Sequence, residues 1–260
     1  MGHMADPMEM FSSQPRGREG DDAPVLAGRL LQVVKGHRTI LDVDEIAVMP
    51  GEVLAVIGPN GAGKSTLLSV LSCLEFPARG RVFYKGGQVT RKDALSVRRR
   101  MAVVFQEALL LDGTVLENVE LGLKLRGHRA MTRETALVWL ERFGILQAQA
   151  QMAHTLSGGE AQRTSLARAF ALTPEILFMD EPFSSVDVLS RQGLIESFKE
   201  AQAASGTTTV LVTHDFREVA ALASRVLVLS GGRLQAAGTP AEIAYHPVWG
   251  ALAGIGRANS

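Results

Sequence analysis

The stretch "GPNGAGKST" (58–66) decides how the rest of the chain is interpreted. It follows the apolar run "EVLAVIG" (52–58) and precedes the helical pattern "STLLSVLSCL" (65–74), so it joins a buried strand to a helix. It also fits G-x-x-x-x-G-K-[ST], a pattern in which backbone amides surround a phosphate. Because strand and helix stand where this mechanism needs them, a chance glycine-rich turn is the less favoured interpretation.

The loop is therefore predicted to bind the phosphates of a nucleotide. Lys64 is expected to reach the terminal phosphates, the Ser65 hydroxyl to bind Mg²⁺, and Thr66 to hold the α-phosphate end. The residues of this predicted site are Gly58, Pro59, Asn60, Gly61, Ala62, Gly63, Lys64, Ser65 and Thr66.

Outward from the loop, short apolar runs alternate with helical patterns. Strands are predicted at 29–34, 45–50, 52–58, 81–86, 101–106, 175–180, 207–215 and 225–234. Helices are predicted at 65–74, 115–125, 133–144, 159–172, about 188–204 and 214–223. This alternation predicts an α/β fold with a mainly parallel sheet, interrupted by a helical stretch from about 108 to 172.

Two later strands end in residues suited to catalysis. "ILFMDEP" (176–182) ends in two carboxylates: Asp180 is placed to hold Mg²⁺ and Glu181 to polarise an attacking water. An ordinary acidic turn before Pro182 is the alternative. "VTHD" (212–215) ends the next strand, and His214 there is expected to contact the γ-phosphate, because α/β sheets bind ligands at the carboxyl ends of their strands.

A second anion site is predicted at "LSGGEAQRTSLARA" (156–169), where a Ser-Gly-Gly turn opens a helix. The N-terminus of a helix attracts anions through its free amides and its dipole. The chain is therefore predicted to carry two phosphate-binding sites, the first cradle at 58–66 and the second cradle at 157–159. This pattern alone does not identify the phosphate that binds in the second cradle.

In this order, the glycine loop, Gln106 after "VVF", "LSGGE", "LFMDEP", "SSVD" (184–187) and "VTHD" resemble the ATP-binding subunit of ABC transporters. The resemblance implies a P-loop NTPase of the ABC ATPase type, with a mainly parallel sheet core, an N-terminal antiparallel β part and an inserted helical subdomain. The ATPase domain is expected at 25–250 with the subdomain at about 108–172. Residues 1–24 are expected to be a disordered lead-in with a tag remnant, and 251–260 a tail.

The same resemblance implies how the second cradle is used. Two subunits face each other head to tail around two ATP, and Ser157, Gly158 and Gly159 of one subunit close on the γ-phosphate held by the other. It further implies that Gln106 binds Mg²⁺ and that Asp187 couples the two sites across the homodimer interface.

Two positions depart from the family pattern. Glu160 stands where the signature usually has glutamine. The family also stacks adenine on an aromatic residue, and counting back from Gly51 puts Lys35 at that position. The Lys35 stem or His37 is the expected substitute.

The implied partners are transmembrane permease subunits and, indirectly, an extracytoplasmic solute-binding protein. The pattern at 112–127 is most similar to importers of small polar solutes, and within them to subunits for tungstate- or molybdate-type oxyanions. An exporter, a lipid-extraction complex and a non-transport ABC ATPase remain alternatives. Leu109, Leu110, Leu111 and Val115 are expected either to form the docking surface for the permease or to pack inside the subdomain.

Composition limits the function classes. Lys and Arg equal Asp and Glu at 27 each, which argues against a nucleic-acid binder. The only cysteine, Cys73, cannot form an internal disulfide and is expected to be a small buried apolar side chain. No apolar run reaches the roughly 18 residues of a membrane span. The expected location is cytoplasmic, peripheral on the inner face of the cell membrane.

Overall fold

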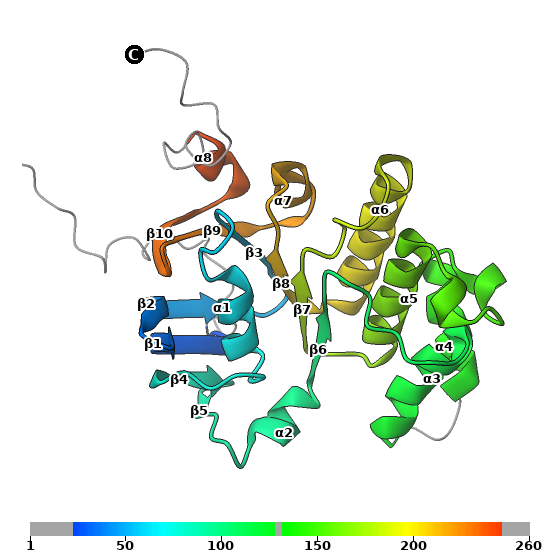
Figure 1. Cartoon of the computed structure of the whole chain (residues 1–260), viewed down its shortest axis with the longest axis horizontal. Coiled ribbons are helices and arrows are strands. Elements are labelled where there is room, and N and C mark those ends of the chain that lie inside the picture. Colours follow the sequence, from blue (N-terminus) through cyan, green and yellow to red (C-terminus); the bar gives the residue numbers. More distant parts are fainter. Residues whose placement is uncertain (1–22, 128–131, 246–260) are drawn as a thin grey trace, which may run out of the picture.

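The computed structural model describes residues 23–127 and 132–245 (Figure 1). The lead-in expected at 1–24, apart from its last two residues, and the tail expected at 251–260 lie outside the described residues.

A four-stranded antiparallel sheet of order β2-β1-β4-β5 contains the first two strands of the described residues. Its strands are β1 (Leu26–Lys35), β2 (Arg38–Val48), β4 (Arg79–Tyr84) and β5 (Gly87–Gln88). The strand expected at 45–50 is thus the second half of a longer strand that pairs with β1. This sheet is the antiparallel β part that the resemblance implied.

A six-stranded sheet of order β10-β9-β3-β8-β7-β6 forms the centre. Its strands are β3 (Val53–Ile57), β6 (Met101–Val104), β7 (Ile176–Asp180), β8 (Thr208–Val212), β9 (Arg225–Ser230) and β10 (Arg233–Gly238). All neighbours are parallel except β9 and β10. β3 and β8 are buried throughout, as expected of parallel strands covered on both faces.

The prediction of one strand at 225–234 was wrong. The run 225–234 is not one strand but two, β9 and β10, which form an antiparallel hairpin. Gly231 (φ 57°) and Gly232 (φ 79°) both take the left-handed conformation between them. Two such residues close a tight hairpin turn, and the predicted strand ran through this turn from the apolar run of β9 to Leu234.

Along the chain, helices alternate with the strands, and the last helix follows β10. They are α1 (Lys64–Leu71), α2 (Ala94–Arg98), α3 (Val115–Leu125), α4 (Thr132–Arg142), α5 (Gly158–Ala171), α6 (Val188–Ser205), α7 (Phe216–Leu222) and α8 (Pro240–Ala244), with short 3₁₀ turns η2 (Leu146–Ala148) and η3 (Ala153–Thr155). Helices α3, α4 and α5 come between β6 and β7 and stand together at one end of the molecule in Figure 1.

Aromatic rings pack these inserted helices against the rest of the fold. Trp139 and Phe143 stack around Phe170 of α5, and Phe170 meets Phe198 of α6 edge-on with ring centroids 5.9 Å apart. The three phenylalanines are almost fully buried. The N-terminal end of α5, where the second cradle begins, is therefore carried by a helix fixed in the core.

The four apolar residues for which two outcomes were expected divide between them. Val115, the first residue of α3, is fully buried in the core of the inserted helices. Leu109 and Leu111 are exposed, and Leu110 is half-buried. Among the described residues, no helix is both long enough and apolar enough to span a membrane.

Candidate functional site

The glycine loop leaves β3 and turns into α1 at the carboxyl end of the central strand. Gly63 is required there: its φ is 101°, and a Cβ at this position would lie 2.8 Å from the carbonyl oxygen of Ile40. α1 then begins at Lys64 with no side-chain hydrogen bond capping its first turn. The amides of this turn are open to a ligand, which makes the loop an anion site.

Lys64 is held inside the loop. Its side chain is buried, and Nζ donates to the carbonyl oxygens of Gly58 (2.9 Å) and Pro59 (3.2 Å). A lysine ammonium has three donors, and these carbonyls use two of them. The charge is thus fixed beside the open amides of α1, where it adds to their attraction for an anion.

The two carboxylates follow β7, two strands from β3. The Ser65 hydroxyl donates to the Asp180 carboxylate, and burial raises the pKa of Asp180 above its usual range in spite of this hydrogen bond. Glu181 has a positive φ of 48°, a left-handed conformation that costs about 1–2 kcal/mol for a non-glycine residue. Its amide donates to the Val212 carbonyl (2.8 Å), which fixes this strained turn against β8. Such strain is concentrated at functional sites.

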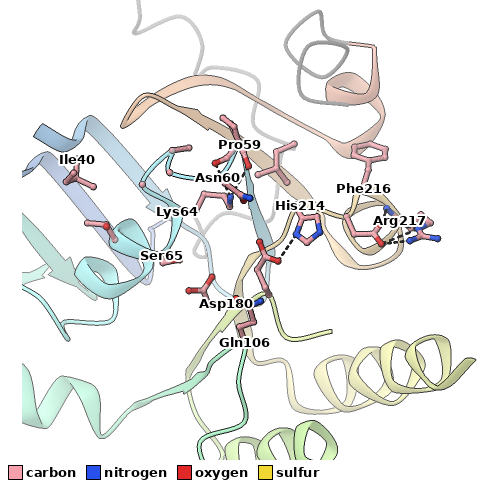
Figure 2. Close-up of a pocket in the computed structure, with 18 of the residues that line it drawn as sticks. Ile40, Pro59, Asn60, Lys64, Ser65, Gln106, Asp180, His214, Phe216 and Arg217 are labelled. Carbon is pink, nitrogen blue, oxygen red and sulfur yellow. Dashed lines mark hydrogen bonds and ion pairs between the residues drawn. The ribbon is translucent and has the colours of Figure 1, made fainter. Parts of the chain in front are cut away.

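His214 follows β8, the strand between β3 and β7. Its Nδ1 lies 2.6 Å from Oε2 of Glu181, and 62% of its side chain is exposed. Figure 2 shows Lys64 and Ser65 on the left, His214 on the right, and Asp180 below, between Ser65 and His214. The three strand ends thus bring the predicted catalytic residues to one place.

A cavity of about 1350 Å³ joins these residues. All the residues of the predicted loop line it, as do Gln106, Asp180, Glu181 and His214. It also reaches residues that the sequence analysis missed, namely Arg38, Ile40, Arg191, Asp215, Phe216 and Arg217. The motif pattern gives no signal for Arg38 and Ile40, because they reach the loop only through the pairing of β2 with β1.

The expected substitute for the adenine-stacking aromatic is not at this cavity. Lys35 ends β1, forms an ion pair with Glu75 (3.5 Å) and is not part of the cavity wall; neither is His37. Arg38 and Ile40 of β2 line the cavity on that side instead. The position that stacks on the base remains a prediction.

The predicted Mg²⁺ ligands offer oxygen donors of three kinds: the Ser65 hydroxyl, the Asp180 carboxylate and the Gln106 side-chain carbonyl. Across residues 23–127 and 132–245, no three His, Cys, Asp or Glu side chains cluster as a dedicated metal cage would require. Mg²⁺ usually binds one or two carboxylates together with substrate phosphates, so this donor set fits it.

The second cradle is built differently from the first. The Ser157 hydroxyl caps α5 by accepting from the Glu160 amide, and the Glu160 carboxylate accepts from the Ser157 amide (2.9 Å) and hydroxyl (2.7 Å). These bonds lower the pKa of the Glu160 carboxyl, which is therefore ionised at neutral pH. A Cβ on Gly158 would lie 2.9 Å from the Ser185 carbonyl oxygen, so this glycine is needed for the close approach of α5 to residues 184–187.

Ser157, Gly158 and Gly159 do not line the cavity of the glycine loop. Ser157 and Gly158 are exposed, and so is Asp187 nearby, whose carboxylate accepts from the Ser190 amide (3.0 Å). In the view of Figure 1, β6 and β7 stand between α1 and α5. Within one chain, the structure thus keeps the two cradles apart.

Comparison with protein families identifies one match, the model described as ABC transporter, over residues 41–184.

Individual relatives are similar over most of this chain. The sulfate/thiosulfate import ATP-binding protein CysA 2 of Chromobacterium violaceum is 37% identical over 82% of this chain, which spans 58% of that relative's length. The trimethylamine N-oxide transport system ATP-binding protein TmoW of Ruegeria pomeroyi is 35% identical, over 95% of this chain and 72% of its own. The tungstate uptake system ATP-binding protein TupC of Peptoclostridium acidaminophilum is 35% identical, over 76% of this chain and 91% of its own.

A solved structure has the same fold. It is a dimeric, post-hydrolysis state of the ATP-binding cassette MJ0796 bound to ADP and Pi. It superposes with a TM-score of 0.76 at 28% identity and covers 83% of this chain and 98% of its own. The fold predicted from the sequence, an α/β ATPase cassette, is confirmed.

Proposed function

This chain belongs to the ABC transporter family, and from that premise we propose that it binds and hydrolyses ATP as one of two identical subunits that drive a separate membrane permease. One observation carries the proposal. The glycine loop, the pair Asp180 and Glu181, and His214 end three neighbouring parallel strands and line one cavity.

The triphosphate of ATP binds in the glycine loop. The open amides at the start of α1 and the buried charge of Lys64 hold its β- and γ-phosphates. Ser65, Asp180 and Gln106 would hold Mg²⁺, which neutralises charge on the phosphates when it is bound. Because the Asp180 carboxylate already accepts from Ser65, the metal site is arranged before a ligand arrives.

Glu181 acts as the general base. Its strained backbone, tied to Val212, directs the carboxylate into the cavity beside His214. There it accepts the proton of the attacking water, and His214, 2.6 Å away, orients that carboxylate and contacts the γ-phosphate. General bases of this kind contribute about 10²- to 10⁴-fold to a rate.

The second cradle serves the partner's nucleotide. Ser157, Gly158 and Gly159 are accessible but lie outside the cavity of their own chain. A second copy, placed head to tail, brings them to the open side of that cavity, and Asp187 beside them couples the two sites. The solved dimer of the MJ0796 cassette supports this arrangement.

The chain powers import, since the three relatives described above are named for uptake or transport systems, two of them for the oxyanions sulfate and tungstate. We propose that the imported solute is small and polar and, more specifically, that it is a tungstate- or molybdate-type oxyanion. An extracytoplasmic binding protein delivers the solute to the permease. We further propose that Leu109 and Leu111 contact the permease and that the chain acts at the inner face of the membrane; the exposure of both side chains supports this.

Hydrolysis and dimerisation test the proposal together. The full chain should hydrolyse ATP only with Mg²⁺, and ATP should shift its elution in size exclusion from monomer to dimer. Lys64→Ala, which removes the buried ammonium, should lose ATP binding and both effects. A full-length chain that binds ATP yet neither hydrolyses it nor dimerises would contradict the proposal.

A further inference from the structure

Arg191 joins two segments that lie on either side of the site. It stands in the first turn of α6, and its guanidinium donates to the Val186 carbonyl (3.1 Å) through one terminal nitrogen. The other terminal nitrogen lies 3.5 Å from Oδ2 of Asp215, the residue after His214. One side chain therefore contacts both the "SSVD" segment (184–187) and the histidine segment (213–215).

A small second cavity lies on the inner side of this contact. It has a volume of about 110 Å³ and is lined in part by Glu181, Arg191, His214 and Glu218. Arg191 borders this cavity and the larger one. Its Nε is buried and has no hydrogen-bond partner among the described residues, so the guanidinium is only partly satisfied in this state of the chain.

The histidine segment is held from inside by buried groups. The Thr213 hydroxyl donates to the Glu218 carboxylate (2.5 Å) and accepts from the Asp215 amide (3.0 Å). Glu218 is 3% exposed, and burial raises its pKa. Arg217 also binds Asp215 (2.6 Å), but from the solvent side, with its side chain 80% exposed. Arg217 holds both carboxylate oxygens of Asp215 from outside, and Arg191 adds an ion pair with Oδ2 from the more buried side, with 23% of its own side chain exposed.

We infer that Arg191 is a positioning residue that ties His214 to the partner-facing segment 184–187. This inference rests on the proposed two-subunit function. Ser185 and Asp187 of that segment are exposed and would be covered by a second copy. A shift of the Val186 carbonyl moves a planar guanidinium whose other end holds Asp215, because its nitrogens are fixed in one plane. The arrival of the partner is thereby transmitted to the histidine beside Glu181.

Arg191→Met in the full chain tests the inference. It removes both contacts while keeping an unbranched side chain of similar length. The kcat for ATP should fall about tenfold, while nucleotide affinity of the monomer stays within about twofold. In a His214→Ala background the same change should cost less than about twofold, because Arg191 acts through His214. The matched control is Arg233→Met, which breaks an arginine–aspartate pair with Asp42 outside both segments and should leave kcat unchanged.

Arg191→Lys separates the two contacts. A lysine keeps the charge for Asp215 but lacks the planar fork that also reaches Val186. Its kcat should therefore remain several-fold below wild type. Full activity with lysine would mean that charge alone suffices, and the tie to Val186 would be wrong.

The inference is also overturned if Arg191→Met raises KM at unchanged kcat, since Arg191 would then contact the nucleotide directly. Additive losses with His214→Ala overturn it as well. Should Arg191→Met fail to fold, Asp215→Asn breaks the same pair from the other end and must show the same dependence on His214. A wild-type chain without ATPase activity would instead refute the proposed function.

Discussion

α1 begins directly after Gly63 and α5 begins with Gly158 and Gly159, yet the two helix N-termini are prepared for a phosphate in different ways. α1 has no capping side chain, and Lys64, Asp180 and His214 face the same cavity. α5 is already capped, since Ser157 and Glu160 satisfy each other's amides in a capping box. The Glu160 carboxylate of that box lies at the start of α5, where its charge repels an anion.

This difference explains why one chain needs two cradles. In the proposed function, the start of α1 binds a nucleotide without help from the partner. The start of α5 is stable without a ligand, so it can stay exposed in a monomer and bind weakly when a partner presents a phosphate. A weak second site suits a dimer that must reopen after hydrolysis.

The largest effect is expected at the first cradle. Glu181→Gln keeps the shape of the side chain but cannot accept a proton, so turnover should fall by about 10²- to 10⁴-fold while ATP binding is kept. The variant should also remain dimeric with ATP and Mg²⁺ in size exclusion, because the nucleotide between the chains persists. Glu196→Gln on the exposed face of α6 is the matched control and should behave as wild type. Turnover of Glu181→Gln near the wild-type rate would refute the assignment of the base.

The raised pKa of Asp180 predicts a pH dependence of the same cradle. Burial favours the protonated form of Asp180, whereas Mg²⁺ binds the carboxylate, so protons and Mg²⁺ compete for this side chain at low pH. As the pH falls through the raised pKa, the half-saturating Mg²⁺ concentration should rise about tenfold per pH unit. Asp180→Asn should need more Mg²⁺ at every pH and lose this slope. A wild-type Mg²⁺ requirement that stays flat down to the lowest pH at which the chain remains folded would contradict the prediction.

Base recognition is expected to be weak in the first cradle. Stacking of a base on an aromatic ring is worth about 1–3 kcal/mol. The residues of β2 that line the cavity are Arg38 and Ile40, and neither is aromatic. The kcat/KM for GTP should therefore lie within about tenfold of that for ATP, a gap of about 1.4 kcal/mol.

An aromatic side chain introduced at position 38 tests this prediction further. Arg38→Tyr should tighten nucleotide binding a few-fold by adding stacking area. Lys35→Tyr should change nothing, because Lys35 lies outside the cavity. A preference for ATP well beyond a hundredfold in steady-state kinetics would show that other contacts read the base.

The smallest effect is expected at the second cradle. Glu160→Gln removes a negative charge next to the partner's γ-phosphate, and charges at a helix N-terminus are worth about 0.3–1 kcal/mol. ATP-driven dimerisation should tighten about two- to fivefold, as measured by analytical ultracentrifugation. Glu117→Gln is the control, because Thr114 and Glu117 form the same capping box at α3, which faces no phosphate in this account. Equal effects of both variants would mean that helix stability, not the phosphate, is responsible.

The sequence predicted the first cradle better than its surroundings. The loop, Asp180, Glu181 and His214 were found because each ends an apolar strand, and parallel strands end at one edge. The hairpin at Gly231 and Gly232 was missed because the prediction extended the apolar run of β9 through the two glycines to Leu234. Arg38 and Arg191 were missed because their contacts depend on strand pairing and on the approach of α6, which motif spacing does not encode.

Mixing two inactive variants tests most directly whether each site is shared between two chains. Gly159→Asp places a carboxylate against the partner's γ-phosphate; its Cβ would lie 3.6 Å from Val186, an ordinary contact, so the subunit should fold and still bind ATP. Gly159→Ala is the control and should remain active. Lys64→Ala destroys the other cradle.

Each variant alone should be inactive, whereas a mixed dimer contains one site with an intact loop and an intact Ser-Gly-Gly turn. An equal mixture should therefore regain about a quarter of wild-type hydrolysis, since half of its dimers are mixed and each holds one complete site. Differently tagged copies that co-purify with ATP yet show no hydrolysis, or a Gly159→Asp monomer that cannot bind ATP, would contradict the account.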